Sequence, residues 1–124
     1  GNKVEDFGIG FFTKYGDGGV DISPIADLMK SEVRILAKEV GVCKEILDAP
    51  PTDGLWGDDR TDEDQLGATY PELEWAMEAF EQKTPQSQFS SRQKEVYAIF
   101  KNHYNQNQHK MQPIPVCKIP VELI

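Results

Sequence analysis

Hydrophobic positions recur at helical spacing over much of the chain, and few segments alternate as a strand would. The clearest repeat runs from residue 24 to residue 40, where apolar side chains return every three or four positions until Gly41. Ser23 can cap this helix, and Pro24 suits its first turn. The pattern predicts a helix with one face in the core. Its apolar positions are Ile25, Leu28, Met29, Val33, Leu36, Ala37 and Val40.

Shorter helical segments flank this helix, and glycine, proline and capping residues set their limits. Thr61 followed by three acidic residues is typical of a helix start, and Gly67 ends that segment. Pro71 suits the first turn of the next helix. The predicted segments are 2–10, 42–47, 61–67, one that opens at Pro71 and buries Leu73, Met77 and Phe80, and 91–104, with Val96, Phe100 and Tyr104 on one face.

Other parts of the chain are predicted to be irregular. Residues 13–19 hold three glycines and are expected to form a loop, because glycine is costly in any regular element. Residues 20–22 are at most a short strand, and Pro113, Pro115 and Pro120 force an extended tail. The chain taken alone is therefore mainly α, and it does not look like a complete βαβ nucleotide-binding domain.

Composition then narrows the range of partners. The chain has 124 residues, 39% hydrophobic and 27% charged, which is the balance of one soluble domain. No apolar run approaches the roughly 20 residues that span a membrane, and no basic stretch leads into an apolar one at the start. A net charge of -8 without a basic patch argues against nucleic acid. Cys43 and Cys117 lie far apart without a CxxC motif, so reduced thiols in the cytoplasm are expected.

The loop at residues 13–19 is the first candidate for chemistry. Lys14 stands beside a Gly-Asp-Gly-Gly turn, and a cation with exposed backbone N–H groups suits a phosphate or a carboxylate. No Walker A motif is present, and a surface turn with a solvated lysine is the alternative. His109 and Lys110, adjacent in the more basic end of the chain, form a second candidate, with a solvated end as the alternative.

Carboxylates near the start provide a candidate metal site. Glu5 and Asp6 offer oxygen ligands for a hard cation such as Mg²⁺. Adjacent side chains on a helix point in different directions, so only one of the two would be a ligand. Acids in an ordinary first helical turn are the alternative. No G-x-S-x-G motif supports nucleophilic catalysis, and His103 on the last helix is expected to be structural.

Taken together and in order, several of these segments resemble the second half of bacterial NAD synthetase. The resemblance covers nearly the whole chain, and the Phe-Thr-Lys-Tyr-Gly-Asp-Gly block within residues 11–22 is its most specific part. The matching segments are 1–3, 11–22, 24, 27–30, 50–56, 61–67 and 109–110.

The resemblance implies the C-terminal portion of an α/β Rossmann-like fold, that of the adenine nucleotide alpha hydrolases (ATP pyrophosphatases). Residues 1–124 would then be the C-terminal part of the NAD synthetase domain. The family's Ser-Gly-Gly-x-Asp-Ser signature and the strands of its sheet are absent. The N-terminal ATP-pyrophosphatase half is therefore expected to be missing, and the fragment alone is expected to be inactive.

The resemblance also implies a reaction, in which deamido-NAD, ATP and ammonia give NAD. ATP first adenylates the nicotinate carboxylate and releases pyrophosphate; ammonia then attacks the acyl-adenylate and expels AMP. The enzyme would be a C–N ligase of NAD biosynthesis that uses Mg²⁺. It would be a cytoplasmic homodimer, with the deamido-NAD site at the subunit interface and with neither nucleic acid nor membrane as a partner.

Residue by residue, the resemblance assigns four side chains to deamido-NAD. These are Lys14, Asp21, His109 and Lys110, with Lys14 in a mobile loop that would close over the site.

The remaining assignments concern ATP, the metal and catalysis. Lys30 and Thr52 match positions that contact ATP. The family's metal-binding acid falls on Glu5 when counted forward from residues 1–3, and on Asp6 when counted back from Lys14. Lys14 and Lys30 are expected to be catalytic, because cations stabilise the charge that develops when a carboxylate approaches a triphosphate.

Two other classes of protein remain open. A non-catalytic module could bind deamido-NAD, or regulate, without ATP-dependent chemistry. Another ATP pyrophosphatase, such as a GMP synthetase-like or tRNA-thiolating enzyme, would share the adenylation step. The nitrogen source, ammonia or a fused glutaminase, also stays open.

Overall fold

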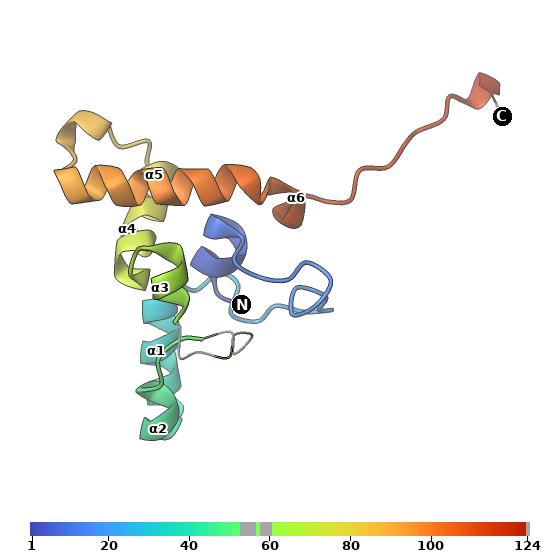
Figure 1. Cartoon of the computed structure of the whole chain (residues 1–124). Helices are drawn as coiled ribbons and strands as arrows, with labels where there is room; N and C mark the ends of the chain where they lie inside the picture. The colour runs from blue at the N-terminus through green and yellow to red at the C-terminus, as the bar shows by residue number, and fades with distance from the viewer. Residues whose placement is uncertain (53–56, 58–60, 124) are drawn as a thin grey trace.

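The computed structural model describes residues 1–52, 57 and 61–123, and these residues form helices and turns without a strand. The mainly α character predicted for the chain is confirmed for this part. Figure 1 shows the order of the elements along the chain. They are η1 (Val4–Ile9, a π-helix), α1 (Lys30–Glu39), α2 (Lys44–Leu47), α3 (Asp62–Leu66), α4 (Tyr70–Glu81), η2 (Gln86–Gln88), α5 (Ser91–Gln106), α6 (Gln108–Met111) and η3 (Val121–Leu123).

The core forms where η1 packs against the crossing of α4 and α5 (Figure 1). Each of the three elements contributes side chains that are completely removed from solvent, among them Ile9, Leu73 and Phe100. The Phe80 ring lies 5.6 Å from the Phe100 ring and 4.8 Å from the Tyr104 ring, between ring centroids. Phe80 and Tyr104, both expected on apolar faces, are only partly buried at the edge of this core.

Side-chain caps explain where the central helices begin. The Thr61 hydroxyl accepts a hydrogen bond from Asp64 N at 3.2 Å, and Gly67 ends α3 at a positive φ of 74°, as predicted. The start of α4 differs from the prediction, because Thr69 caps it through Glu72 N and places its first residue at Tyr70 rather than at Pro71.

The start of α1 was predicted wrongly. Residues 24–27 form a turn, and the helix begins at Lys30 instead of near Ser23. The Leu28 carbonyl accepts a hydrogen bond from Lys3 N at 2.8 Å, which takes it out of any helical ladder. Met29 is extended, and its N–H donates to the Glu32 carboxylate at 2.8 Å. This side-chain cap fixes the first turn of α1.

The prediction that α1 has a core face is also wrong for the described part of the chain. No residue of α1 is buried, and Leu36 on its apolar stripe is 46% exposed. Figure 1 shows α1 and α2 as an arm that leads away from α4 and α5. Gly41, with a φ of 82°, follows the helix as predicted. The helical pattern is therefore real. Met29, which precedes α1, is buried, but the contacts of α1 with α2 and α4 leave most of its apolar face exposed.

The end of the chain follows the prediction of an extended tail. After α6 it runs away from the helices, with its apolar residues exposed, to the short turn η3 (Figure 1). In the described ranges, no helix has both the length and the apolar character needed to cross a membrane.

Candidate functional site

The π-helix η1 directs Glu5 and Asp6 to different surroundings. Val4 and Ile9 anchor η1 in the core with no exposed surface, and Gly10 ends it with a positive φ of 62°. Glu5 contacts α1 and α4, whereas Asp6 lines a cavity beside the loop at residues 13–19. The two adjacent carboxylates point in different directions, as expected for neighbours on a helix, and they belong to two different groups of predicted site residues.

Glu5 lies at the centre of a cluster that joins four elements. Its Oε1 atom accepts hydrogen bonds from Lys30 Nζ at 2.5 Å and from Tyr70 Oη at 2.6 Å. Lys30 Nζ also lies 3.9 Å from the centroid of the Tyr70 ring. Tyr70 Oη is 3.1 Å from Asp62 Oδ2 on α3. The predicted metal ligand and the predicted ATP-binding lysine thus form one ion pair.

The surroundings of Glu5 favour its ionised form. Burial acts to raise the pKa of this carboxyl, but hydrogen bonds from Lys30 and Tyr70, together with the charge of Lys30, outweigh burial and lower it. Burial and the neighbouring carboxylate of Glu5 raise the pKa of the Tyr70 hydroxyl. Tyr70 therefore keeps its proton and donates it in the hydrogen bond to Glu5.

Sequence reasoning found Glu5 and Lys30 but missed Tyr70 and Asp62 as members of this cluster. Asp62 was interpreted only as an acid in the first turn of a helix, and it does stand at the start of α3. Tyr70 is 65 positions away from Glu5, and no motif marks it. Only the packing of α4 against η1 and α1 brings these residues together.

A second group of predicted residues surrounds a cavity of about 420 Å³. Asp6 lines it from η1, Lys14 and Asp21 from the loop region, and Lys110 from α6. Burial raises the pKa of Asp6, although the amino group of Gly1 opposes this effect. The structure thus places three of the four residues assigned to deamido-NAD around one cavity.

Backbone carbonyls hold both lysines of this cavity. Lys110 Nζ donates to the carbonyls of Gly10 at 2.8 Å and Phe12 at 2.7 Å. Lys14 Nζ donates to the carbonyl of His109 at 2.5 Å. The side chain of His109 is exposed and does not line the cavity, so its main chain makes the contact. These bonds tie α6 to the loop across almost the whole length of the chain.

The glycines of the loop matter through close packing rather than through unusual backbone angles. In the described residues, positive φ values occur at Gly10, Gly41, Gly67 and Lys83, and none occurs in this loop. A Cβ atom at Gly18 would lie 2.5 Å from the Phe12 ring. Gly18 is therefore required for the ring to pack against the turn.

Thr52 lies at the edge of the described structure. It is exposed and follows Pro51, whose carbonyl accepts a hydrogen bond from Asp62 N at 3.1 Å. That bond connects the residue before Thr52 to Asp62, which belongs to the Glu5 cluster. The rest of the matched motif, at residues 53–56, falls outside the described residues.

The carboxylates fit a metal ion that is shared with a substrate. Within the described ranges, no group of three or more His, Cys, Asp and Glu side chains could hold a metal. Mg²⁺ is commonly bound by one or two carboxylates together with substrate phosphates and water. Glu5 or Asp6 could provide such a single ligand.

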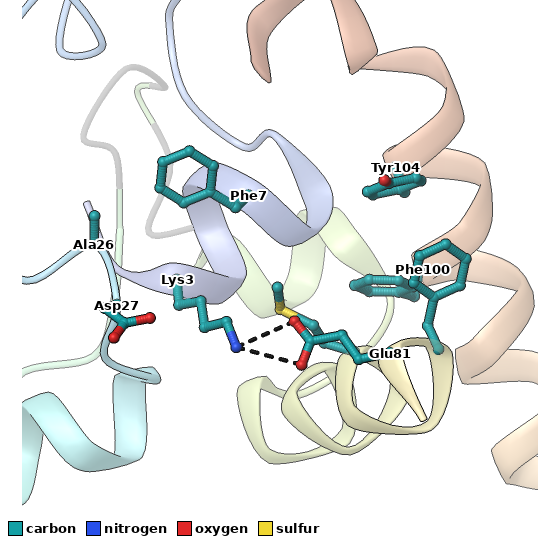
Figure 2. Close-up of a pocket in the computed structure, with 9 residues that line it drawn as sticks. Lys3, Phe7, Ala26, Asp27, Glu81, Phe100 and Tyr104 are labelled. Carbon is teal, nitrogen blue, oxygen red and sulfur yellow. Dashed lines mark hydrogen bonds and ion pairs between the residues drawn. The ribbon is translucent and has the colours of Figure 1, made fainter. Parts of the chain in front are cut away.

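Figure 2 shows a different cavity, of about 380 Å³, which Phe7 lines from η1. Phe100 and Tyr104 line it from α5, and Lys3 Nζ lies 3.1 Å from Glu81 Oε1. None of the predicted site residues lines this cavity.

Comparison with known proteins establishes the family. Residues 1–114 match the family described as NAD synthase, and the chain belongs to that family. It is 37% identical over 119 residues to the NH(3)-dependent NAD(+) synthetase of Archaeoglobus fulgidus, covering 96% of this chain and 45% of the relative. It is 44% identical over 110 residues to the protein of the same name from Picrophilus torridus, covering 88% of this chain and 41% of the relative.

A solved structure, that of NMN synthetase from Francisella tularensis, is similar in fold. It aligns with a TM-score of 0.75 and 35% identity, over 96% of this chain and 45% of that chain. The chain thus spans less than half the length of each of these relatives. The resemblance to NAD synthetase is confirmed, and it extends to archaeal relatives as well as bacterial ones.

Proposed function

We propose that this chain is the C-terminal part of an NAD synthetase that amidates deamido-NAD with ammonia and ATP. Membership of the NAD synthase family supports the reaction class, and the relatives named as NH(3)-dependent enzymes support ammonia as the nitrogen source. The observation that carries the proposal is the single cavity lined by Lys14, Asp21 and Lys110. The intact enzyme is a C–N ligase, and this half alone is inactive.

In the first step, an oxygen of the nicotinate carboxylate attacks the α-phosphorus of ATP, and the bond to pyrophosphate breaks. Two anions approach each other in this step, so cations at the phosphates lower the barrier. Lys30 and Thr52 bind ATP in this proposal, and Lys14 neutralises charge where the two substrates meet. When bound, Mg²⁺ neutralises phosphate charge and supports departure of pyrophosphate.

In the second step, ammonia attacks the carbonyl carbon of the acyl-adenylate, AMP leaves, and a proton is lost from nitrogen. Water would compete for the same carbonyl, so the site must be covered. The loop at residues 13–19, tied to α6 by Lys14, is suited to this task. Asp21, His109 and Lys110 complete the deamido-NAD site.

The magnesium ligand is either Glu5 or Asp6. Asp6 lines the cavity that the substrate would enter, whereas Glu5 is paired with Lys30. Glu5→Gln and Asp6→Asn in the full-length protein separate the two possibilities. The variant that raises the Mg²⁺ concentration for half-maximal activity by about tenfold or more identifies the ligand.

The test begins with the reading frame upstream of Gly1 in the source DNA. A Ser-Gly-Gly-x-Asp-Ser motif in frame supports the proposal, and the full-length protein is then assayed with deamido-NAD, ATP, Mg²⁺ and ammonium. Formation of NAD, AMP and pyrophosphate in equal amounts is the expected result. Binding of deamido-NAD without ATP consumption points instead to the non-catalytic binding or regulatory module. Glutamine in place of ammonium tests for a fused glutaminase.

The solved neighbour favours a second candidate substrate. Its name, NMN synthetase, directs attention to amidation of nicotinate mononucleotide. Both substrates present a nicotinate carboxylate. Deamido-NAD also carries an adenylate half, which nicotinate mononucleotide lacks. Competition between the two in one assay decides between them, and a higher kcat/KM for deamido-NAD is expected.

We also infer that the intact enzyme is a cytoplasmic homodimer. The family resemblance supports this inference, as does the series of exposed apolar side chains on the arm formed by α1 and α2. These are Ile35, Leu36, Val40 and Ile46. Light scattering on the full-length protein as it elutes from a size-exclusion column gives its molar mass and tests the homodimer. A monomer at micromolar concentration contradicts it.

A further inference from the structure

Tyr70, the first residue of α4, contacts both members of the ion pair between Glu5 and Lys30. Its side chain is buried, with 2% of the residue exposed, and its hydroxyl and ring face make separate contacts. We propose that Tyr70 is a positioning residue that holds Glu5 and Lys30 in the orientation in which they meet a metal-bound triphosphate. This inference rests on the proposed function, because it assigns Tyr70 to the same site.

The contacts fix the Glu5 carboxylate and leave part of the Lys30 ammonium available. The hydrogen bonds from Lys30 and from Tyr70 both end on Glu5 Oε1, and the side chain of Asn2 also bonds to this carboxylate. The Lys30 ammonium has three N–H bonds. One points to Glu5 and the ring of Tyr70 covers another side, which leaves a direction for a phosphate oxygen. An ammonium N–H is thereby presented beside the Glu5 carboxylate.

Tyr70 is itself held firmly. Its backbone N–H donates to Glu63 Oε1 at 2.8 Å, which joins the start of α4 to α3. Thr69 caps the helix at the preceding position. Tyr70 does not line the cavity beside Lys14, so it acts on the substrate only through Glu5 and Lys30.

The test uses Tyr70→Phe in the full-length protein. This substitution keeps the ring beneath Lys30 and removes only the hydroxyl. We expect the half-saturating concentrations of Mg²⁺ and ATP to rise about tenfold and kcat to fall by a similar factor, as for other residues that orient a metal ligand. The KM for deamido-NAD is expected to stay within about twofold, because its site lies in the other group of residues.

A matched control is available at Tyr97. This tyrosine is also buried, at 8% exposure, and its ring lies 5.2 Å from that of Phe89. Tyr97→Phe removes a hydroxyl from the same core without touching Glu5, and it is expected to leave all kinetic constants near wild type. If Tyr70→Phe behaves in the same way, the hydroxyl does not position the pair and the proposal is wrong.

Thermal unfolding separates this inference from the proposed function. If the hydroxyl acts through Glu5, Tyr70→Phe lowers Tm less in a Glu5→Ala background than in the wild-type background. An equal loss in both backgrounds overturns the inference, whether or not the protein makes NAD. A wild-type protein that makes no NAD, yet shows this coupling, overturns the proposed reaction and leaves the positioning of Glu5 and Lys30 by Tyr70 supported.

Discussion

At the scale of single residues, charges proposed to act in the reaction differ in their contacts from charges that pair within the fold. Lys14 and Arg92 illustrate the difference. Lys14 donates a hydrogen bond to the backbone carbonyl of His109, beside the candidate cavity. Arg92 donates two hydrogen bonds to the carboxylate of Glu72, and this pair belongs to neither of the two groups of predicted site residues. Substitutions of Lys14 and of Arg92 are therefore expected to have different effects on activity and on stability.

Replacement of Lys14 is expected to affect activity and not stability. Lys14→Ala in the full-length protein removes a cation from the meeting point of two anions, and turnover should fall about 100-fold or more. The free energy of unfolding should change by about 0.5 kcal/mol or less, because the lost hydrogen bond is exposed. Lys101→Ala, at an exposed position on α5, is the control. Near-normal turnover by the Lys14 variant would remove the loop from the mechanism.

The pair of Glu72 and Arg92 gives a pH-dependent contribution to stability. Hydrogen bonds from Arg92 lower the pKa of Glu72 from 4.5 to about 2. A carboxyl whose pKa falls on folding stabilises the protein fully above its unfolded pKa, and this stabilisation is lost as pH falls from 4.5 towards 2. The Tm of the wild type should therefore fall more steeply over this range than that of Glu72→Gln. The difference should be small, because solvent screens an exposed pair.

A second carboxylate serves as the control for this measurement. Glu95 lies 3.4 Å from Arg92 and its side chain is 66% exposed, so Glu95→Gln should leave the slope of Tm against pH nearly unchanged. Parallel curves for the wild type and Glu72→Gln would show that the pair contributes nothing measurable.

At the scale of elements, helical periodicity predicted where helices lie better than it predicted which elements pack against them. The segments at η1, α3, α4 and α5 all appear near the predicted positions, because capping residues and apolar spacing are local properties. The start of α1 depends instead on a hydrogen bond from Lys3, which is distant in sequence. Burial of an apolar face likewise depends on what packs against it, and spacing alone carries no such information.

Two substitutions measure this difference between elements in the 124-residue chain. Phe100→Ala on α5 removes a side chain with no exposed surface from the centre of the core, and it should lower the free energy of unfolding by about 3–5 kcal/mol. Leu36→Ala on α1 should cost about 1 kcal/mol or less, because that residue is already 46% exposed. Urea denaturation followed by circular dichroism gives both values. Similar losses would mean that α1 is covered in solution.

At the scale of the whole molecule, the sequence predicts candidate site residues one by one, and only the structure shows which of them lie together. Recognised motifs supplied Lys14, Asp21, Lys30 and Lys110, because each stands in a distinctive segment. Their division into two groups follows from the way η1 turns adjacent carboxylates apart. Tyr70 could not be found this way, since its role arises from packing among α1, α4 and η1.

Residues 9–12 are joined to α6 and to Asn107 just before it, and the last prediction concerns this connection. Asn107 Nδ2 donates to the Ile9 carbonyl at 2.8 Å, next to the bonds that Lys110 makes to Gly10 and Phe12. A chain truncated after Met111 keeps all three bonds and should lose about 1 kcal/mol of stability or less, because residues 112–123 are exposed.

A chain truncated after Gln106 loses those three bonds, each of which contributes about 1 kcal/mol. It should therefore unfold at a clearly lower urea concentration. Its loop should also open more often, because Lys14 loses its acceptor on His109 together with the ties at Gly10 and Phe12. Trypsin cleavage after Lys14 measures this opening directly, and it should be several times faster than in the longer truncation. Equal cleavage rates would show that α6 does not hold the loop, and closure over the substrate would then have to come from another part of the protein.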